Sequence, residues 1–487
     1  MTSETTARGT VLLVLSKALF LMGSVLIHVF LGRYLGPRGY GQYGLVMSIL
    51  IWFEVVINSA VPWAVSKVIS ERKTLARSVF LQGIGLQLTF SVVVLAIFLV
   101  LAPSLARVFG DDSIRLLLWW VALDIPFYAL LSVVLTYFNG LQRFGRQGLV
   151  SISRILFKAL ATVFLVLGGY DIVGALTANI IASALALTAG LFLLRLPRSF
   201  PEKVRLIDRV LNFGLPYTLF LLSAQLLLSI DLWSVKILVD DPAAAGFYTS
   251  AQTISRVPYF LFLGLTTALF PALSHSVSSG QVEASRVQVR QAMRLQALVL
   301  LPAGAVVSGS SGAVVKLLFG NDFQPAVGPL ILLFWGMILF TCFYNLAVIL
   351  SVTGRPLTAL GFSLVCIAGD ALLNWLLVPR MGLMGAALAT ALTSLAGTVA
   401  LAALVTIRFG GLLSMRTLIK LVAAAGLIFA LSTLLDLEGP LLVVEGVVLF
   451  GIYLGSVVIL KEVHRGDLNR LTALWPSSLR WPRREVW

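Results

Sequence analysis

Charge is scarce in this chain. Asp, Glu, Lys and Arg together make up 12% of its 487 residues, whereas about a quarter of the residues in an ordinary globular domain are charged. Hydrophobic residues make up 59%, and a disordered chain is poor in Leu, Ile, Val and Phe. The composition therefore excludes a soluble or disordered protein and indicates a membrane protein.

Cysteine is also rare, and several enzyme motifs are missing. Cys342 and Cys366 lie inside apolar runs without CxxC spacing, which is typical of neither a disulfide framework nor a zinc site. The sequence contains no P-loop for ATP. No connection between apolar runs exceeds about twenty residues, and a separate catalytic domain needs about 50. We therefore expect no catalytic residue, no metal and no cofactor.

Apolar runs fill most of the chain. A membrane-spanning helix needs about 20 predominantly apolar residues, and fourteen such runs follow one another with short polar breaks. We therefore predict an all-α polytopic membrane protein with fourteen transmembrane helices. The predicted spans are Val11–Leu31, Gly44–Val68, Val79–Leu101, Ile114–Phe138, Leu149–Leu167, Ile172–Leu194, Leu211–Val239, Ser250–Leu273, Leu295–Phe319, Val327–Val352, Leu357–Val378, Leu383–Ile407, Leu418–Leu435 and Leu441–Leu460.

The few charges are unevenly divided between the two sides of the predicted membrane. The chain carries 36 Lys and Arg against 21 Asp and Glu, a formal net charge of +15. With the N-terminus inside, all but seven cations fall on the inner side, as the positive-inside rule requires. We therefore predict a multi-pass protein of the cytoplasmic (inner) membrane with both termini cytoplasmic, and no nucleic-acid partner. The seven outer cations are Arg33, Arg38, Arg107, Arg115, Lys236, Lys316 and Arg380.

The spans group into lobes. We predict an N-lobe of six helices, a basic cytoplasmic linker, a C-lobe of six helices, two further helices and a basic cytoplasmic tail. The tail holds Trp475, Trp481 and Trp487 and would contact membrane lipids, because indole rings and cations favour the headgroup region. The predicted boundaries are residues 1–194, 195–210, 211–407, 408–460 and 461–487.

The two groups of six align as an internal repeat at an offset of 205 residues. Six is an even number, so both halves begin on the same face and are related by a pseudo-two-fold axis along the membrane normal. Transporters built this way place their substrate site between the lobes, near the midplane. The matched positions are Pro37 with Pro242, Gly41 with Gly246, Tyr43 with Tyr248 and Ile49 with Ile254.

The end of the first span carries a glycine-rich segment, LGRYLGPRGYGQYG, over residues 31–44. With the six-plus-six-plus-two plan, this segment resembles the polysaccharide transporter family of lipid-linked oligosaccharide and O-antigen flippases, within the multidrug/oligosaccharidyl-lipid/polysaccharide exporter superfamily. The resemblance implies alternating access by two lobes around a cationic cavity. That cavity would receive the diphosphate and sugars while the polyprenyl tail stays in lipid. The motif marks a turn and transfers no binding residue to this chain.

Four cations lie inside the predicted spans. An ionisable group there is costly unless it faces protein or water, so each is a candidate functional residue. Arg154 and Lys158 are four residues apart and share a helix face, while Lys17 and Arg256 lie on the first and eighth spans. All four could line one cavity and bind a diphosphate. Alternatively, Lys17 and Arg154 could extend their long stems to the inner headgroups.

Acids and amides inside the spans form a second candidate set. Short acidic side chains cannot reach the headgroups, so they could hold a coupling proton or sodium ion, or bind sugar hydroxyls. Equally, each acid could neutralise a buried cation. The residues are Glu54, Asn58, Asp124, Asp231, Asp370 and Asn374, with each Asn one helical turn after an acid.

We therefore predict a flippase that translocates a polyprenyl-diphosphate-linked oligosaccharide across the cytoplasmic membrane by alternating access, for cell-surface polysaccharide synthesis. One alternative is an ion-coupled small-molecule or drug exporter of the same superfamily, but buried cations would repel cationic drugs. Another is an integral-membrane glycosyltransferase or polymerase. That enzyme would be expected to have a large outer domain and acidic metal ligands near its first outer loop, and Gly32–Tyr43 holds no acid.

Overall fold

The computed structural model describes residues 3–196, 206–210, 215–263, 281–435 and 437–462, with a few positions between 273 and 279. Side chains are described from residue 19 onward within these ranges, apart from those of 209 and 215–217. The first half consists of helices α1 (Ser3–Ser59), α2 (Val61–Glu71), η1 (Lys73–Leu75), α3 (Ala76–Val108), α4 (Ser113–Ala122), α5 (Asp124–Gly140), α6 (Phe144–Leu165), η2 (Val166–Tyr170) and α7 (Asp171–Phe192).

The second half continues the all-helical pattern, and no strand occurs in the described ranges. Its elements are α8 (Leu206–Arg209), α9 (Leu215–Leu227), α10 (Ile230–Leu238), α11 (Ala244–Ser255), α13 (Val282–Gly309), α14 (Ser311–Phe319), η4 (Asn321–Ala326), α15 (Val327–Val352), α16 (Pro356–Met381), α17 (Leu383–Phe409), α18 (Met415–Leu435) and α19 (Leu441–Ile459). The prediction of an all-α protein is confirmed.

Among the described residues, ten helical segments are long and apolar enough to cross a membrane, or eleven if the bent pair α9 and α10 forms one crossing. Two segments, Leu19–Glu71 and Phe144–Phe192, contain 53 and 49 residues, more than twice the roughly 20 that one crossing needs. Each covers two predicted spans. The chain is therefore a multi-pass membrane protein, and its helices are compatible with fourteen crossings.

Backbone breaks divide these two long segments. Gly36 adopts φ 66° and ψ 177° inside α1, a combination essentially restricted to glycine because it has no Cβ. Pro37 follows and lacks the backbone N–H that would continue the helical hydrogen bonds. Between α6 and α7, Gly169 has a φ of 87°. The regular helix is therefore broken at both points, each of which lies between two predicted spans.

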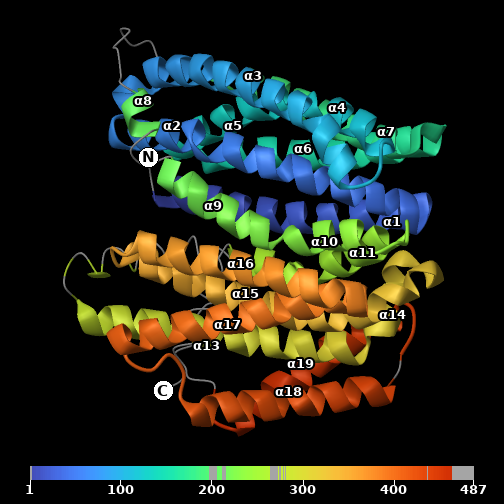
Figure 1. Ribbon diagram of the computed structural model, residues 1–487. Coiled ribbons are helices and arrows are strands. Elements are labelled where there is room, and N and C mark those ends of the chain that lie inside the picture. The colour runs from blue at the N-terminus through green and yellow to red at the C-terminus, as the bar shows by residue number, and fades with distance from the viewer. Residues whose placement is uncertain are drawn as a thin grey trace.

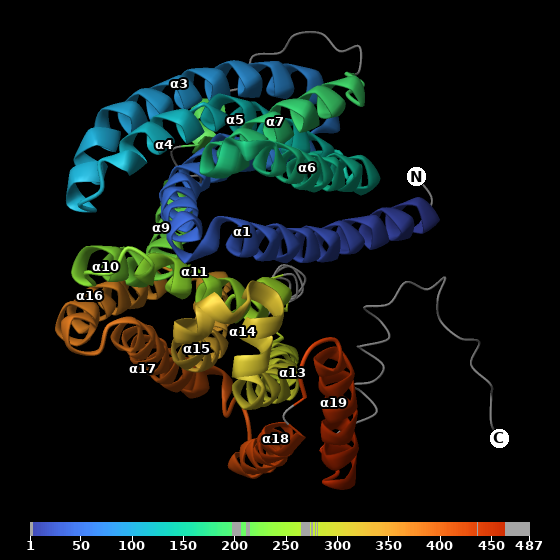
Figure 2. The ribbon, with the colours of Figure 1, turned by 90° about the vertical axis from the view of Figure 1, so that its right-hand side faces the viewer.

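Figure 1 shows two helix bundles side by side, the first made of α1–α7 and the second of α13–α17 together with α9–α11. Helices α9, α10 and α11 run along the seam. Both α9 and α11 pack on α1 of the first bundle. On the other side, α9 packs on α16 and α11 packs on α15. Figure 2 shows α18 and α19 beyond α13, on its far side from α1. This arrangement places the predicted extra pair of helices outside the two bundles.

The two halves of the sequence repeat meet at one end of the seam. A Cβ on Gly41 would lie 2.6 Å from the backbone nitrogen of Gly246, and a Cβ on Gly246 would collide with the carbonyl of Pro37. Tyr40 and Tyr43 are fully buried beside them. The repeat glycines are therefore required by close backbone contact between the bundles. The predicted topology makes this the outer end.

The predicted linker and tail are only partly described. Leu206, on the short helix α8 inside the predicted linker, is buried against the core of the first bundle. The remaining linker positions 197–205 and tail positions 463–487 lie outside the described residues. The domain boundaries stay predictions.

Candidate functional site

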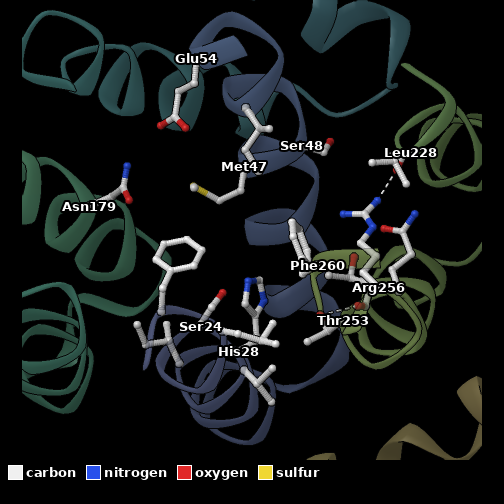
Figure 3. A pocket seen from close by; sticks show the side chains of 18 of the residues that line it. Ser24, His28, Met47, Ser48, Glu54, Asn179, Leu228, Thr253, Arg256 and Phe260 are labelled. Atoms are coloured by element: carbon white, nitrogen blue, oxygen red, sulfur yellow. Dashed lines mark hydrogen bonds between the residues drawn. The ribbon is translucent and has the colours of Figure 1, made fainter. Parts of the chain in front are cut away.

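A cavity of about 360 Å³ lies between the two bundles. The first bundle contributes residues of α1, α5, α6 and α7, and the second contributes residues of α9, α10 and α11 and the segment that follows α11. Figure 3 shows that Glu54, Asn179, His28 and Arg256 surround one open space. Such a cavity at the interface of two repeats is the usual position of a transporter's substrate site.

Three of the four predicted cations line this cavity. Arg154 and Lys158 reach it from consecutive turns of α6, and Arg256 reaches it from the C-terminal end of α11 in the other bundle. The side chain of Lys17 lies outside the described residues, although its backbone belongs to α1. Arg154, Lys158 and Arg256 therefore lie around the same cavity.

Arg154 is held by the aromatic ring of Tyr128. The guanidinium carbon lies 4.2 Å from the ring centroid, a favourable cation–π geometry, and Nε donates to Ser183 Oγ at 3.4 Å. The Tyr128 hydroxyl in turn accepts a hydrogen bond of 2.9 Å from Asn58 Nδ2. These contacts leave the Nη atoms of Arg154 without a partner among the described residues, so they can receive an anion.

The acids of the first bundle lie near these cations. Glu54 lines the cavity, and its Oε1 has no hydrogen-bond partner among the described residues. Asp124 is completely buried behind the cavity wall, where its Oδ2 accepts a 2.8 Å hydrogen bond from Asn179. Both acids are close enough to Arg154 and Lys158 to interact through their charges. They partly balance the two cations without forming a direct ion pair with either.

Asp231 of the second bundle is enclosed by donors. Its carboxylate accepts hydrogen bonds of 2.9 Å from Tyr248 and Gln252, and of 2.8 Å from the backbone of Leu232. Thr390 of α17 completes the set at 3.4 Å. Asp231 is 2% exposed and lies among α10, α11 and α17.

Asp370 and Asn374 lie on α16 and are equally buried. The amide of Asn374 donates to the backbone carbonyl of Asp370 at 2.9 Å, not to its carboxylate. The carboxylate of Asp370 has no hydrogen-bond partner among the described residues, and it borders a space of only about 10 Å³ with Thr390 and Thr393. No group of three His, Cys, Asp or Glu residues in the described ranges is arranged to hold a metal ion.

Hydrogen bonds close the predicted outer end of the seam. His28 Nδ1 lies 2.9 Å from the Tyr40 hydroxyl, which lies 2.9 Å from Thr253 Oγ1 of the opposite bundle. Arg33 donates to the backbone carbonyls of Leu317 and Leu318. These contacts join the bundles directly and close this end of the cavity.

An ion pair lies beside the same seam. Lys236 Nζ of α10 is 3.0 Å from Asp111 Oδ2 in the loop between α3 and α4. Burial raises the pKa of Asp111, but hydrogen bonds from Ser113, Lys236 and Gln42 and the Lys236 charge outweigh it, so the pKa lies below its usual value. Asp111 therefore stays charged at neutral pH and attracts Lys236.

Several cavity residues carry no charge and gave no clear pattern in the sequence. Tyr128, Asn179 and Gln252 line the cavity beside the predicted cations. Tyr128 and Asn179 are single polar residues in largely apolar stretches, which occur throughout membrane helices, and Gln252 is one of several uncharged polar residues between positions 249 and 255. Helical spacing could have found Gln252, because it precedes Arg256 by one turn on the same face.

The two bundles, the cavity at their interface and the membrane-crossing helices define a polytopic membrane transporter. The solved structure of lipid II flippase MurJ in an inward closed conformation has a TM-score of 0.73 at 15% identity, covering 93% of this chain and 99% of that one. An inward-facing multidrug resistance MATE family transporter of the MOP superfamily has a TM-score of 0.70 at 16% identity, covering 81% and 95%. The chain shares their fold.

The sequence places the chain in a particular family. Residues 6–277 match the polysaccharide biosynthesis protein family, and the chain belongs to it. Stage V sporulation protein B of Bacillus subtilis (strain 168) is 25% identical over 363 residues, covering 66% of this chain and 67% of that protein. Lipid II flippase MurJ of the same organism is 24% identical over 413 residues, covering 74% of each. The predicted resemblance to polysaccharide flippases is confirmed.

Proposed function

We propose that this protein flips a polyprenyl-diphosphate-linked oligosaccharide across the cytoplasmic membrane by alternating access, for cell-surface polysaccharide synthesis. The observation that carries the proposal is the meeting of Arg154 and Lys158 of one bundle with Arg256 of the other around one cavity. These three cations and one acid, Glu54, line the cavity. This excess of positive charge favours a multiply charged anion. Arg supplies a forked donor and Lys a point charge, which together suit a diphosphate.

Lys17 is proposed as a fourth cation of this site. Leu21, Ser24 and His28 follow it on α1 and all line the cavity. Their separations of 4, 7 and 11 residues from position 17 define one helix face. Lys17 would lie toward the inner entrance, where an arriving diphosphate first meets the protein.

The closed outer end supports loading from the cytoplasmic side. The contacts of Tyr40, Arg33 and Gly246 would separate when the bundles rock and open the cavity outward. The glycan would cross within the cavity while the polyprenyl tail remained among the membrane lipids. The predicted orientation, with both termini cytoplasmic, belongs to this proposal.

Coupling to an ion gradient is proposed for the acids of the second bundle. Thr390 donates a hydrogen bond to Asp231 and borders the same small space as Asp370, so Thr390 lies between the two acids. The Asp370 carboxylate is buried and has no hydrogen-bond partner among the described residues. A buried carboxylate of this kind either takes up a proton or attracts a cation. A proton or sodium ion bound there would change the packing of α10, α16 and α17.

A drug exporter is the second candidate, because the multidrug transporter shares this fold and Glu54 faces the cavity. The cation excess argues against a cationic drug.

We propose reconstituting the protein in proteoliposomes with a polyprenyl-diphosphate-linked trisaccharide and measuring, with a membrane-impermeant lectin, how much sugar appears on the opposite leaflet. The flippase predicts protein-dependent transfer. Transfer of a cationic dye without the lipid would support the exporter.

A further inference from the structure

A second cavity lies where α2 begins and α5 ends. Its volume is about 280 Å³, and it is lined from α1, α2, α5 and α9. None of the described residues that line it is charged, in contrast to the central cavity. Its polar and aromatic lining consists of Asn58, Ser59, Trp63, Ser66, Thr136 and Asn139.

One pair of side chains separates the two cavities. Tyr128 lines the central cavity and stacks on Arg154, while its hydroxyl accepts the hydrogen bond from Asn58, which lines the second cavity. A diphosphate held by Arg154 would therefore lie just across the Tyr128–Asn58 contact from the neutral pocket.

The pocket keeps hydrogen-bonding capacity for a ligand. The Asn139 side chain is exposed and makes no hydrogen bond with the described residues, and Asn58 uses one amide hydrogen on Tyr128 and retains its carbonyl oxygen. The Thr136 hydroxyl donates to the carbonyl of Ser132 and keeps its acceptor lone pairs. Trp63 adds an aromatic ring, and the Lys67 ammonium lies 5.0 Å from the centroid of this ring.

We propose that this pocket is a subsite for an uncharged sugar ring, a hexose or N-acetylhexosamine, of the glycan attached to the diphosphate. Amides and hydroxyls match sugar hydroxyls, and an indole matches the apolar face of a sugar ring. No charged side chain lines the pocket for a second phosphate, and its polar groups suit an acyl chain poorly. This inference rests on the proposed function and adds the identity of the group that follows the diphosphate.

The test compares two probes on the full-length protein in nanodiscs: undecaprenyl diphosphate, and undecaprenyl diphosphate carrying one N-acetylglucosamine. We expect the glycosylated lipid to bind more tightly to the unmodified protein. The double variant Trp63→Leu/Asn139→Ala should lose about tenfold in affinity for the glycosylated lipid, since each contact contributes about threefold or more. Its affinity for the bare diphosphate lipid should not change.

Matched variants separate the possible results. Asn321→Ala, at an exposed amide just after α14, which lies at the opposite end of the molecule from α2 in Figure 1, should bind both lipids normally. Arg154→Ala should weaken the binding of both. If the double variant does not insert into the membrane, Thr136→Val, which changes the side-chain volume little, replaces it in the comparison of the two lipid affinities. Equal effects on both lipids, or none on either, would overturn the sugar subsite. Failure of the unmodified protein to bind the bare diphosphate lipid would instead overturn the proposed function.

Discussion

The two halves of this chain place their buried charges differently. In the first bundle, Arg154, Lys158 and Glu54 face the central cavity. In the second, Asp231 and Asp370 are 2% and 1% exposed and do not line it. Among the described charged residues of the second half, Arg256 alone reaches the cavity. The first half therefore places buried charges at the cavity, while the second encloses Asp231 and Asp370 among its helices.

This difference arises on a shared backbone plan. Gly44, Ser48 and Ile51 line the cavity, and so do the residues 205 positions later, Thr249, Thr253 and Arg256. The repeat therefore places equivalent helix faces on either side of the cavity. The side chains on those faces have diverged, since Ile51 in the first half corresponds to Arg256 in the second.

The largest effect is expected from removing the cations of the first bundle. Arg154→Ala combined with Lys158→Ala should reduce transport of the diphosphate-linked glycan by about a hundredfold or more, since each charged contact contributes about 1.5–3 kcal/mol. The lectin assay in proteoliposomes measures this rate. Arg380→Ala, at an exposed cation of α16, is the control. Undiminished transport by the double variant would remove both residues from the site.

A smaller but distinct effect is expected in the second bundle. Asp370→Asn keeps the volume of the side chain and removes its charge, so transport driven by a proton or sodium gradient should fall about tenfold or more. Binding of undecaprenyl diphosphate should remain within about twofold. Asp322→Asn, at an exposed acid, should change neither quantity. A variant that still responds fully to both gradients would exclude Asp370 as the coupling site.

The seam between the halves can be altered at a single glycine. Gly246→Ala places a Cβ against the Pro37 carbonyl and should shift the equilibrium toward the outward-open state by about tenfold, as expected for about 1–2 kcal/mol of overpacking. Accessibility of a cysteine probe in the cavity to an impermeant reagent measures this shift. Gly85→Ala, where a Cβ meets open space, should have no such effect. Equal labelling of the two variants would contradict the proposed role of the outer contacts.

The smallest effect is expected at the Lys236–Asp111 pair. Lys236→Ala should increase outward opening only a few-fold, because a partly exposed ion pair contributes about 0–1 kcal/mol. Because the pKa of Asp111 is lowered in the closed protein, the pair stabilises closure fully at pH values above the ordinary carboxyl pKa of about 4. This stabilisation is lost as the pH falls through the lowered pKa. In the same accessibility assay, this pair should therefore cause no change in labelling of the cysteine probe between pH 6 and 8. A change in that range that Lys236→Ala abolishes would refute this assignment.

The sequence predicted the all-helical membrane fold and the candidate cations, because apolar length and intramembrane charge follow directly from the cost of burying polar groups in lipid. It could not show which neighbour each helix face meets. Asn58 follows Glu54 by one turn, yet it contacts Tyr128 and lines the second cavity. Asp231 and Asp370 look like cavity acids by depth alone, but their helices turn them toward α17. The sugar pocket depends on neutral residues from four helices, which no local spacing connects.

We propose that cations from both halves form one site for a diphosphate. The most direct measurement is a titration of the full-length protein in nanodiscs with undecaprenyl diphosphate and with a cationic amphiphile of equal chain length, with and without Arg256→Ala. We expect the diphosphate to bind at least about tenfold more tightly than the cationic amphiphile, and Arg256→Ala to reduce this difference. Tighter binding of the cationic amphiphile, or diphosphate binding that Arg256→Ala leaves unchanged, would contradict it.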